Sequence, residues 1–190
     1  MLRRTFLLVL SALPVCAQLP VETVERIGRL VETKMAKDSI PGLSVAVAVN
    51  GELRWEQGYG FQDLEALVPA TSQTVYRLAS ISKPITAVAV MQLVERGLVS
   101  LDDPIQKYVP SFPRKIQGEV RIHHLLAHTS GIRHYRGNEF GLAAPFRTLE
   151  SALGVFRNDP LEFAPGERYL YSTFGYSLLQ GVVENVSGRS

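Results

Sequence analysis

The sequence predicts an α/β fold of the α+β type, in which an antiparallel sheet hairpin precedes a helical region. Three observations support this prediction. Apolar residues recur at helical spacing over 21–38, two strand-like runs flank Asn50-Gly51, and apolar helical runs follow over 84–97 and 174–186. Asn-Gly between two such runs is the strongest short-range signal of a β-hairpin. We therefore expect neighbouring strands to pair directly, without a crossover helix between them.

The first 17 residues have the pattern of a secretory signal peptide. Arg3 and Arg4 precede a short apolar run, and Ala17 closes a cleavage site of small residues. The run is too short to span a bilayer comfortably. We therefore expect a secreted or periplasmic protein with no stable membrane span. An uncleaved anchor, or a lipid attached to Cys16, remains the alternative.

The chain after this leader is electrically balanced. Residues 18–190 carry 18 basic and 18 acidic side chains, and they contain no cysteine. A neutral chain has no overall electrostatic attraction to nucleic acid. Without cysteine, neither a disulfide nor a thiolate metal site can form. We therefore expect no nucleic-acid partner.

The first helix and the hairpin follow from local patterns. The helix over 21–38 is expected to end before Pro41-Gly42. Strands are predicted over 43–49 and 52–57, and Gly58-Tyr59-Gly60 is expected to end the second strand. Apolar and polar residues alternate in that second strand, which is typical of a half-buried sheet.

The next helix begins after a less regular stretch. Residues 61–74 show no sustained period and predict a loop, and 75–79 predict a short extended approach. Pro84 suits the first turn of a helix, and Gly97 is a good stop. This arrangement places Ser80 at or near the N-terminus of a mostly apolar helix.

The remaining elements are shorter and more irregular. A short helical piece is predicted to start at 101–104 and to end at 108–110, and a helix is predicted over 120–127. Residues 132–160 are rich in Gly, Pro, Asn and Arg, and predict a long surface excursion with one helix near 148–157. The last helix is expected over 174–186. We expect residues 18–190 to form one domain.

The most informative motif is Ser80-Ile81-Ser82-Lys83. On a helix, residues three apart share a face, so the Ser80 hydroxyl and the Lys83 amine can meet. A serine hydroxyl is a poor nucleophile until a neighbouring base takes its proton. Lysine can act as that base only in a shielded pocket that lowers its pKa. The bland alternative is a capping serine beside a solvated lysine.

Two further groups of residues could carry chemistry. Tyr171 precedes the last helix, and its phenol could shuttle protons if it lay near Ser80 and Lys83. Packing of its ring with the hydroxyl at a wet edge is the ordinary alternative. His124 and His128 are four residues apart, which is the spacing of a two-histidine metal face. Neither an H-E-x-x-H glutamate nor an obvious third ligand accompanies them, so we expect no metal and interpret His128 as a capping residue at a helix end.

Six motifs follow one another along the chain: Gly58-Tyr59-Gly60, Ser80-x-x-Lys83, Leu101-Asp102-Asp103-Pro104, Leu125-Leu126-Ala127-His128-Thr129-Ser130-Gly131, Pro165-Gly166-Glu167 and Tyr171-Ser172-Thr173. Their order and spacing resemble those of the serine β-lactamase-related family, which includes class C β-lactamases, penicillin-binding DD-peptidases and related esterases. The resemblance covers nearly all of residues 21–190. The stretches Ser130-Gly131-Ile132-Arg133-His134-Tyr135 and Tyr171-Ser172-Thr173-Phe174-Gly175-Tyr176 look closest to the mitochondrial branch of the family.

The resemblance implies a role for each matching residue. Ser80 would be the acylated nucleophile, and its backbone N–H would supply half of an oxyanion hole. Lys83 would activate Ser80 and relay protons, and Tyr171 would be the general base or acid. Many relatives have asparagine at the position of Thr173. Threonine has a shorter side chain and no amide donor. We therefore expect Thr173 to contact the substrate, but with weaker recognition of a substrate amide and less efficient β-lactam turnover.

The resemblance also implies that part of the family domain lies beyond this sequence. The family carries a later Lys/His-Thr-Gly strand, and no such triplet follows Tyr171. We therefore interpret 18–190 as an incomplete domain of a secreted serine hydrolase that acts on a small-molecule or peptide amide, ester or lactam, without a cofactor. The alternative is a truncated, non-catalytic remnant that binds or self-associates through an open sheet edge.

Overall fold

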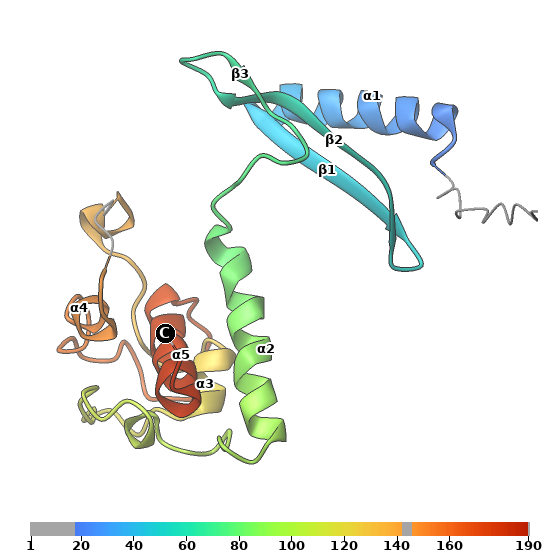
Figure 1. The fold of residues 1–190 in the computed structure, drawn as a ribbon. Helices are drawn as coiled ribbons and strands as arrows, with labels where there is room; N and C mark the ends of the chain where they lie inside the picture. Colours follow the sequence, from blue (N-terminus) through green and yellow to red (C-terminus); the bar gives the residue numbers. More distant parts are fainter. Residues whose placement is uncertain (1–17, 142–145, 190) are drawn as a thin grey trace, which may run out of the picture. The chain divides into compact units, whose positions relative to one another are not determined.

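The computed structural model describes residues 18–141 and 146–189, which form two compact units (Figure 1). The first unit ends at Arg77 and the second begins at Leu78. An antiparallel sheet in the first unit and helices in both confirm the predicted fold class. The signal peptide predicted at 1–17, with Cys16, lies outside the described residues. Among those described, no helix combines the length and apolar character that a membrane span requires.

The first unit consists of one helix and a small sheet. Helix α1, Val21–Asp38, has the predicted bounds, and strands β1, Gly42–Val49, and β2, Glu52–Asp63, form the predicted antiparallel hairpin. Asn50 and Gly51 have φ angles of 53° and 80°. Two successive positive φ angles are typical of a type I′ turn, which Asn-Gly adopts readily.

The second strand is longer than predicted. It continues past Gly60 to Asp63 and pairs with β3, Val68–Pro69, inside the stretch expected to be a loop. The glycines permit a close approach of backbones here and do not end the strand. A Cβ atom on Gly58 would lie 2.3 Å from the carbonyl oxygen of Ala70. No side chain larger than hydrogen fits at that position.

The second unit packs three helices around a fourth. Helix α5, Thr173–Ser187, contacts α2, Ser82–Glu95, α3, Ile122–Leu126, and α4, Leu149–Leu153 (Figure 1). These helices correspond to the four predicted over 84–97, 120–127, 148–157 and 174–186. The described part of the unit also contains the short 3₁₀ helices η1, Ala79–Ile81, η2, Ile105–Lys107, and η3, Gly137–Gly141. The short piece predicted from 101–104 corresponds to η2.

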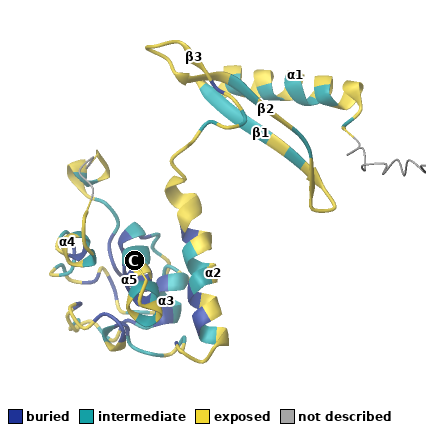
Figure 2. Cartoon of the chain, in the orientation of Figure 1, coloured by how far each residue is buried: buried dark blue, intermediate teal, exposed yellow. Residues whose placement is uncertain are grey.

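The apolar core lies in the second unit, where buried residues gather on α5 and its neighbours (Figure 2). Four apolar side chains of α5 are buried at its centre: Phe174, Leu178, Leu179 and Val182. Burial of one such side chain contributes about 1.5–3 kcal/mol to folding. The core therefore fixes α5, and with it the segment that leads into its N-terminus.

The expectation of a surface excursion over 132–160 is wrong in part. Ile132, Leu153 and Phe156 belong to the core, and Arg133 is buried at 6% exposure. The guanidinium of Arg133 contacts the carboxylates of Glu139 and Asp159. These few apolar residues are spaced too irregularly to produce a period, so the pattern resembled a loop.

Candidate active site

Ser80 and Lys83 lie at the junction between η1 and α2. Ser80 is the middle residue of the 3₁₀ turn, and Lys83 is the second residue of α2. The Nζ of Lys83 donates a hydrogen bond of 3.3 Å to the Oγ of Ser80. Ala79, directly before the serine, has a φ of 46°. This left-handed conformation costs a non-glycine residue about 1–3 kcal/mol, and such strain is concentrated at functional sites.

Lys83 is shielded although it begins a helix. The residue is only 9% exposed. Its Nζ lies 4.8 Å from the ring centroid of Tyr171 and 5.9 Å from that of Tyr176. Aromatic faces attract a cation within about 6 Å. The amine is therefore shielded close to two aromatic rings and beside the Ser80 hydroxyl.

Tyr171 reaches the same hydroxyl from the other side of the unit. Its Oη donates a hydrogen bond of 2.7 Å to the Oγ of Ser80. Interaction with the Lys83 amine, and then the hydrogen bond with Ser80, lower the pKa of Tyr171 from its usual 10.0. A lowered pKa makes the phenolate more accessible near neutral pH. The structure thus brings the three predicted catalytic residues together, while their roles stay predictions.

The N-terminus of α5 fixes the segment that carries Tyr171. Ser172 caps the helix, because its Oγ accepts the N–H of Gly175 at 3.1 Å. The same hydroxyl donates to the carbonyl of Arg133 at 2.8 Å, and Ser172 is 1% exposed. Serine is a favoured N-cap residue, worth about 1 kcal/mol over alanine. The cap ties the residue after Tyr171 to both the helix and the buried arginine.

Thr173 stands at the first position of α5 and is half-buried. Its backbone N–H donates to the Nδ1 of His134 at 3.4 Å. The predicted contact of its side chain with a substrate stays a prediction.

Sequence reasoning missed the histidines that surround Tyr171. The ring centroid of His128 lies 4.6 Å from that of Tyr171, and the ring of His134 meets it edge-on at 5.3 Å. The first was interpreted as a helix cap and the second was not singled out. Both belong to motif stretches whose order was recognised, but no spacing rule assigns a partner 37 or more residues away.

The two histidines with metal-ligand spacing make separate contacts. The Nδ1 of His124 accepts the N–H of Arg121 at 3.1 Å, at the start of α3. The Nδ1 of His128 accepts the N–H of Ser172 at 3.2 Å, at the start of α5. Within residues 18–141 and 146–189, no three His, Cys, Asp or Glu side chains gather closely enough to hold a metal ion.

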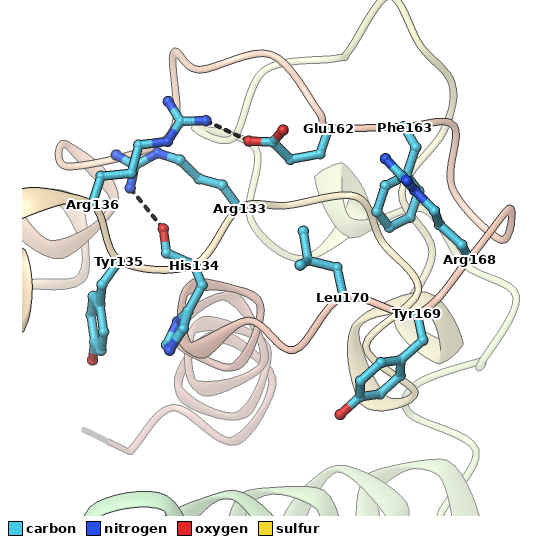
Figure 3. A pocket seen from close by; sticks show the side chains of 9 residues that line it. All are labelled: Arg133, His134, Tyr135, Arg136, Glu162, Phe163, Arg168, Tyr169 and Leu170. Atoms are coloured by element: carbon cyan, nitrogen blue, oxygen red, sulfur yellow. Dashed lines mark hydrogen bonds and ion pairs between the residues drawn. The ribbon is translucent and has the colours of Figure 1, made fainter.

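A hollow of about 350 Å³ lies beside the Tyr171 segment (Figure 3). His134 and Leu170 line it, so it begins next to the residues that flank Tyr171. Across the hollow, Arg136 forms an ion pair with Glu162, and the guanidinium of Arg168 stacks on Phe163 at 4.6 Å. The hollow therefore lies beside neighbours of Tyr171, and none of Ser80, Lys83 and Tyr171 lines it.

Comparison with known proteins shows similarity to one family over most of the chain. The family model described as "Beta-lactamase" matches residues 27–190. The human serine beta-lactamase-like protein LACTB, a mitochondrial protein, is 32% identical over 92% of this chain and 44% of its own length.

Solved structures give the same result. The octameric penicillin-binding protein homologue from Pyrococcus abyssi is 36% identical, with a TM-score of 0.73 over 88% of this chain and 40% of its own. EstCE1, described as a hydrolase with promiscuous acyltransferase activity, is 26% identical, with a TM-score of 0.75 over 87% of this chain and 47% of its own. The chain therefore spans less than half the length of each of these relatives.

Proposed function

The chain belongs to the beta-lactamase family, and we propose that it is a serine hydrolase that forms an acyl intermediate on Ser80. One observation carries this proposal. The Ser80 hydroxyl accepts hydrogen bonds from both the Lys83 amine and the Tyr171 phenol, at 3.3 and 2.7 Å. The Tyr171 distance lies within the range for proton transfer, and the Lys83 distance lies just beyond it, as is common before substrate binds. An aligned nucleophile with two proton-handling groups also supports hydrolysis over the alternative of a non-catalytic remnant.

The proposed reaction has two steps. The Tyr171 phenolate takes the Ser80 proton as Oγ bonds to the acyl carbon, and the leaving amine or alcohol receives that proton from Tyr171. Water then attacks the acyl-serine by the same proton route, and Ser80 recovers its proton as the acid departs. Lys83 stabilises the phenolate and relays protons between these positions. The Ser80 backbone N–H would stabilise the oxyanion.

The substrate class is proposed only as an acyl compound, with an amide, ester or lactam bond to be broken. The hollow lined by Tyr169 and Leu170 would take part of this substrate, and Thr173 would contact the substrate. The named relatives include a penicillin-binding protein homologue and a hydrolase with acyltransferase activity. Family membership alone therefore does not choose among these bonds.

Export through a cleaved leader is a separate part of the proposal. The pattern at residues 1–17 supports it, whereas LACTB is mitochondrial. Expression of the full chain in a bacterium, followed by fractionation and N-terminal sequencing, tests this part. We expect a periplasmic product that begins at Gln18, and an intact product retained in the cytoplasm would contradict it.

A fluorophosphonate probe that forms a covalent bond with activated serines tests the hydrolase proposal. We expect the folded chain to bind one probe, on Ser80 by peptide mass spectrometry, and Ser80→Ala to abolish labelling. Ser82→Ala is the matched control, because Ser82 belongs to the same motif and is exposed at the start of α2. It should label like the wild type. Lys83→Ala should lose labelling while it keeps the helical circular dichroism spectrum.

A folded wild-type protein that takes no probe at any pH between 5 and 9 would overturn the proposal. Labelling of Ser82, or equal labelling of the Ser80→Ala protein, would also overturn it.

A further inference from the structure

His128 holds the segment around Tyr171 on both sides. Its backbone carbonyl accepts the N–H of Leu170 at 2.8 Å, and its ring Nδ1 accepts the N–H of Ser172 at 3.2 Å. These donors are the residues directly before and after Tyr171. The imidazole also lies against the phenol ring, with centroids 4.6 Å apart and planes inclined at 34°. One residue therefore restrains both the backbone and the ring of Tyr171.

The backbone of His128 has a conformation that is uncommon outside glycine. Its φ is 58°, in the left-handed region that histidine, asparagine and aspartate adopt more often than other non-glycine residues. The strain is tolerated where surrounding contacts determine the conformation. In this position His128 turns the chain at the end of α3, so that carbonyl and ring both face the Tyr171 segment.

The contact with Ser172 requires a neutral imidazole. A backbone N–H can only donate, so Nδ1 must be the acceptor and the ring proton must lie on Nε2. Protonation would turn Nδ1 into a donor that faces another donor, and the hydrogen bond would be lost. Burial lowers the pKa of His128 from its usual 6.5, and Lys83 and then His134 add to this effect. The ring is therefore neutral at pH 7.

The groups that face the ring come from every neighbouring element. Lys83 approaches from α2 and Tyr176 from α5, with the Tyr176 ring centroid at 5.1 Å. Tyr169 and Tyr171 approach from the segment before α5, and His134 from the segment after α3. Within the described residues, no carboxylate is recorded against the imidazole. A proton on His128 would thus meet a positive amine and rings, with no negative partner to stabilise it.

We propose that His128 is a positioning residue that holds the phenol of Tyr171 against Ser80 by accepting the Ser172 N–H in its neutral form. This inference rests on the proposed function for Tyr171. Protonation of His128 at acid pH would break this hydrogen bond and lower the reaction rate. This effect of pH is separate from any effect on Ser80, Lys83 and Tyr171. His134 contributes a second, longer contact of the same kind, from the N–H of Thr173 at 3.4 Å.

Two substitutions separate the acceptor from the ring. In His128→Asn, the side-chain oxygen takes the place of Nδ1 and does not titrate, whereas His128→Gly has no acceptor. Both residues tolerate the left-handed backbone. We expect His128→Gly to lower the fluorophosphonate labelling rate at pH 7.5 by about 10- to 100-fold, with the apparent probe affinity within about threefold. His128→Asn should recover most of that loss.

The pH dependence of the labelling rate distinguishes the proposed role of His128 from a purely structural one, because a purely structural residue would not change it. The ratio of labelling rates at pH 5.0 and pH 7.5 should be at least about threefold higher in His128→Asn than in the wild type, because asparagine cannot be protonated. His124→Asn is the matched control, since this histidine caps α3 and contacts Arg121 instead. Its ratio should equal that of the wild type. An unchanged ratio in His128→Asn would overturn the inference.

A spectroscopic measurement tests the inference without any activity. The ¹⁵N NMR shifts of the His128 ring in the whole chain should show an unprotonated Nδ1 and a protonated Nε2 at pH 7.5. A proton on Nδ1 would overturn the inference even if Ser80 is labelled. A correct tautomer in a protein that takes no probe would overturn the proposed function alone.

Discussion

The Oη of Tyr171 lies 2.7 Å from the Oγ of Ser80, although 91 residues separate them in the chain. The two lie before different helices, since Ser80 is in η1, ahead of α2, and Tyr171 precedes α5. Direct packing of α2 on α5 brings these two N-terminal ends together. The contact is therefore a property of the packed core, and a change that loosens the core would separate the proposed reacting groups.

Removal of the Tyr171 hydroxyl should abolish proton transfer without loss of the fold. In Tyr171→Phe we expect the labelling rate of Ser80 to fall by about 10²–10⁴. The ring contacts remain, so the melting temperature should change by no more than about 2 °C. Tyr169→Phe is the control, because Tyr169 is 65% exposed and its hydroxyl has no recorded bond to Ser80. A Tyr171→Phe protein with more than half of the wild-type rate would contradict the role of Tyr171.

The pH at which Tyr171 ionises should depend on Lys83. Because the Lys83 amine is the largest cause of the lowered pKa, Lys83→Met should raise it towards 10.0. The phenolate forms as pH rises, so the wild-type labelling rate should increase with pH and reach its plateau below pH 10. NMR of ¹³Cζ-labelled tyrosine gives the titration midpoint directly, even in an inactive variant. An unchanged midpoint in Lys83→Met would show that Lys83 does not lower the pKa of Tyr171.

Glu139 should stabilise the second unit in a pH-dependent way. Its carboxylate accepts two hydrogen bonds from buried Arg133, at 2.7 and 2.9 Å. The Arg133 guanidinium, as the main cause, lowers the pKa of Glu139 below 4.5. A carboxylate whose pKa is lower in the folded state contributes its full stability above the unfolded pKa, and loses it as pH falls through the folded value.

We therefore expect Glu139→Gln to reduce the free energy of unfolding by roughly 2 kcal/mol at pH 7. The difference in free energy of unfolding between Glu139→Gln and the wild type should become smaller below pH 4.5. Glu119→Gln is the control, because its pair with Arg121 is about 42% exposed on both sides, and such pairs contribute less than about 1 kcal/mol. Urea unfolding at several pH values measures both. If this difference does not change with pH, the Glu139 carboxylate does not stabilise the unit through its charge.

Replacement of Gly131 by alanine should destabilise the protein much more than the same replacement at Gly137. Both have positive φ angles, of 75° and 51°. A Cβ atom on Gly131 would lie 2.3 Å from the carbonyl oxygen of Phe163, whereas one on Gly137 would meet nothing within 4 Å. We expect Gly131→Ala to cost about 3 kcal/mol or more and Gly137→Ala about 1 kcal/mol. Equal costs by urea unfolding would show that the backbone contact at Gly131 adjusts freely.

Local sequence patterns were sufficient to predict most of the helices and strands. The period over 21–38, the turn at Asn50-Gly51 and the apolar run of α5 each depend on nearby residues, so the sequence predicted their bounds within a few positions. The extension of β2 to Asp63 was missed, because glycine usually interrupts a strand and its use for close backbone packing leaves no periodic trace.

The sequence by itself determined that the side chains of Ser80 and Lys83 can meet, because residues three apart share one face of a helix. It also placed a tyrosine just before a helix. Only the tertiary structure decided that this phenol meets the serine and that His128 supports it. Such contacts join residues 44 to 91 positions apart, and their geometry follows from how buried helix faces pack, which no local pattern encodes.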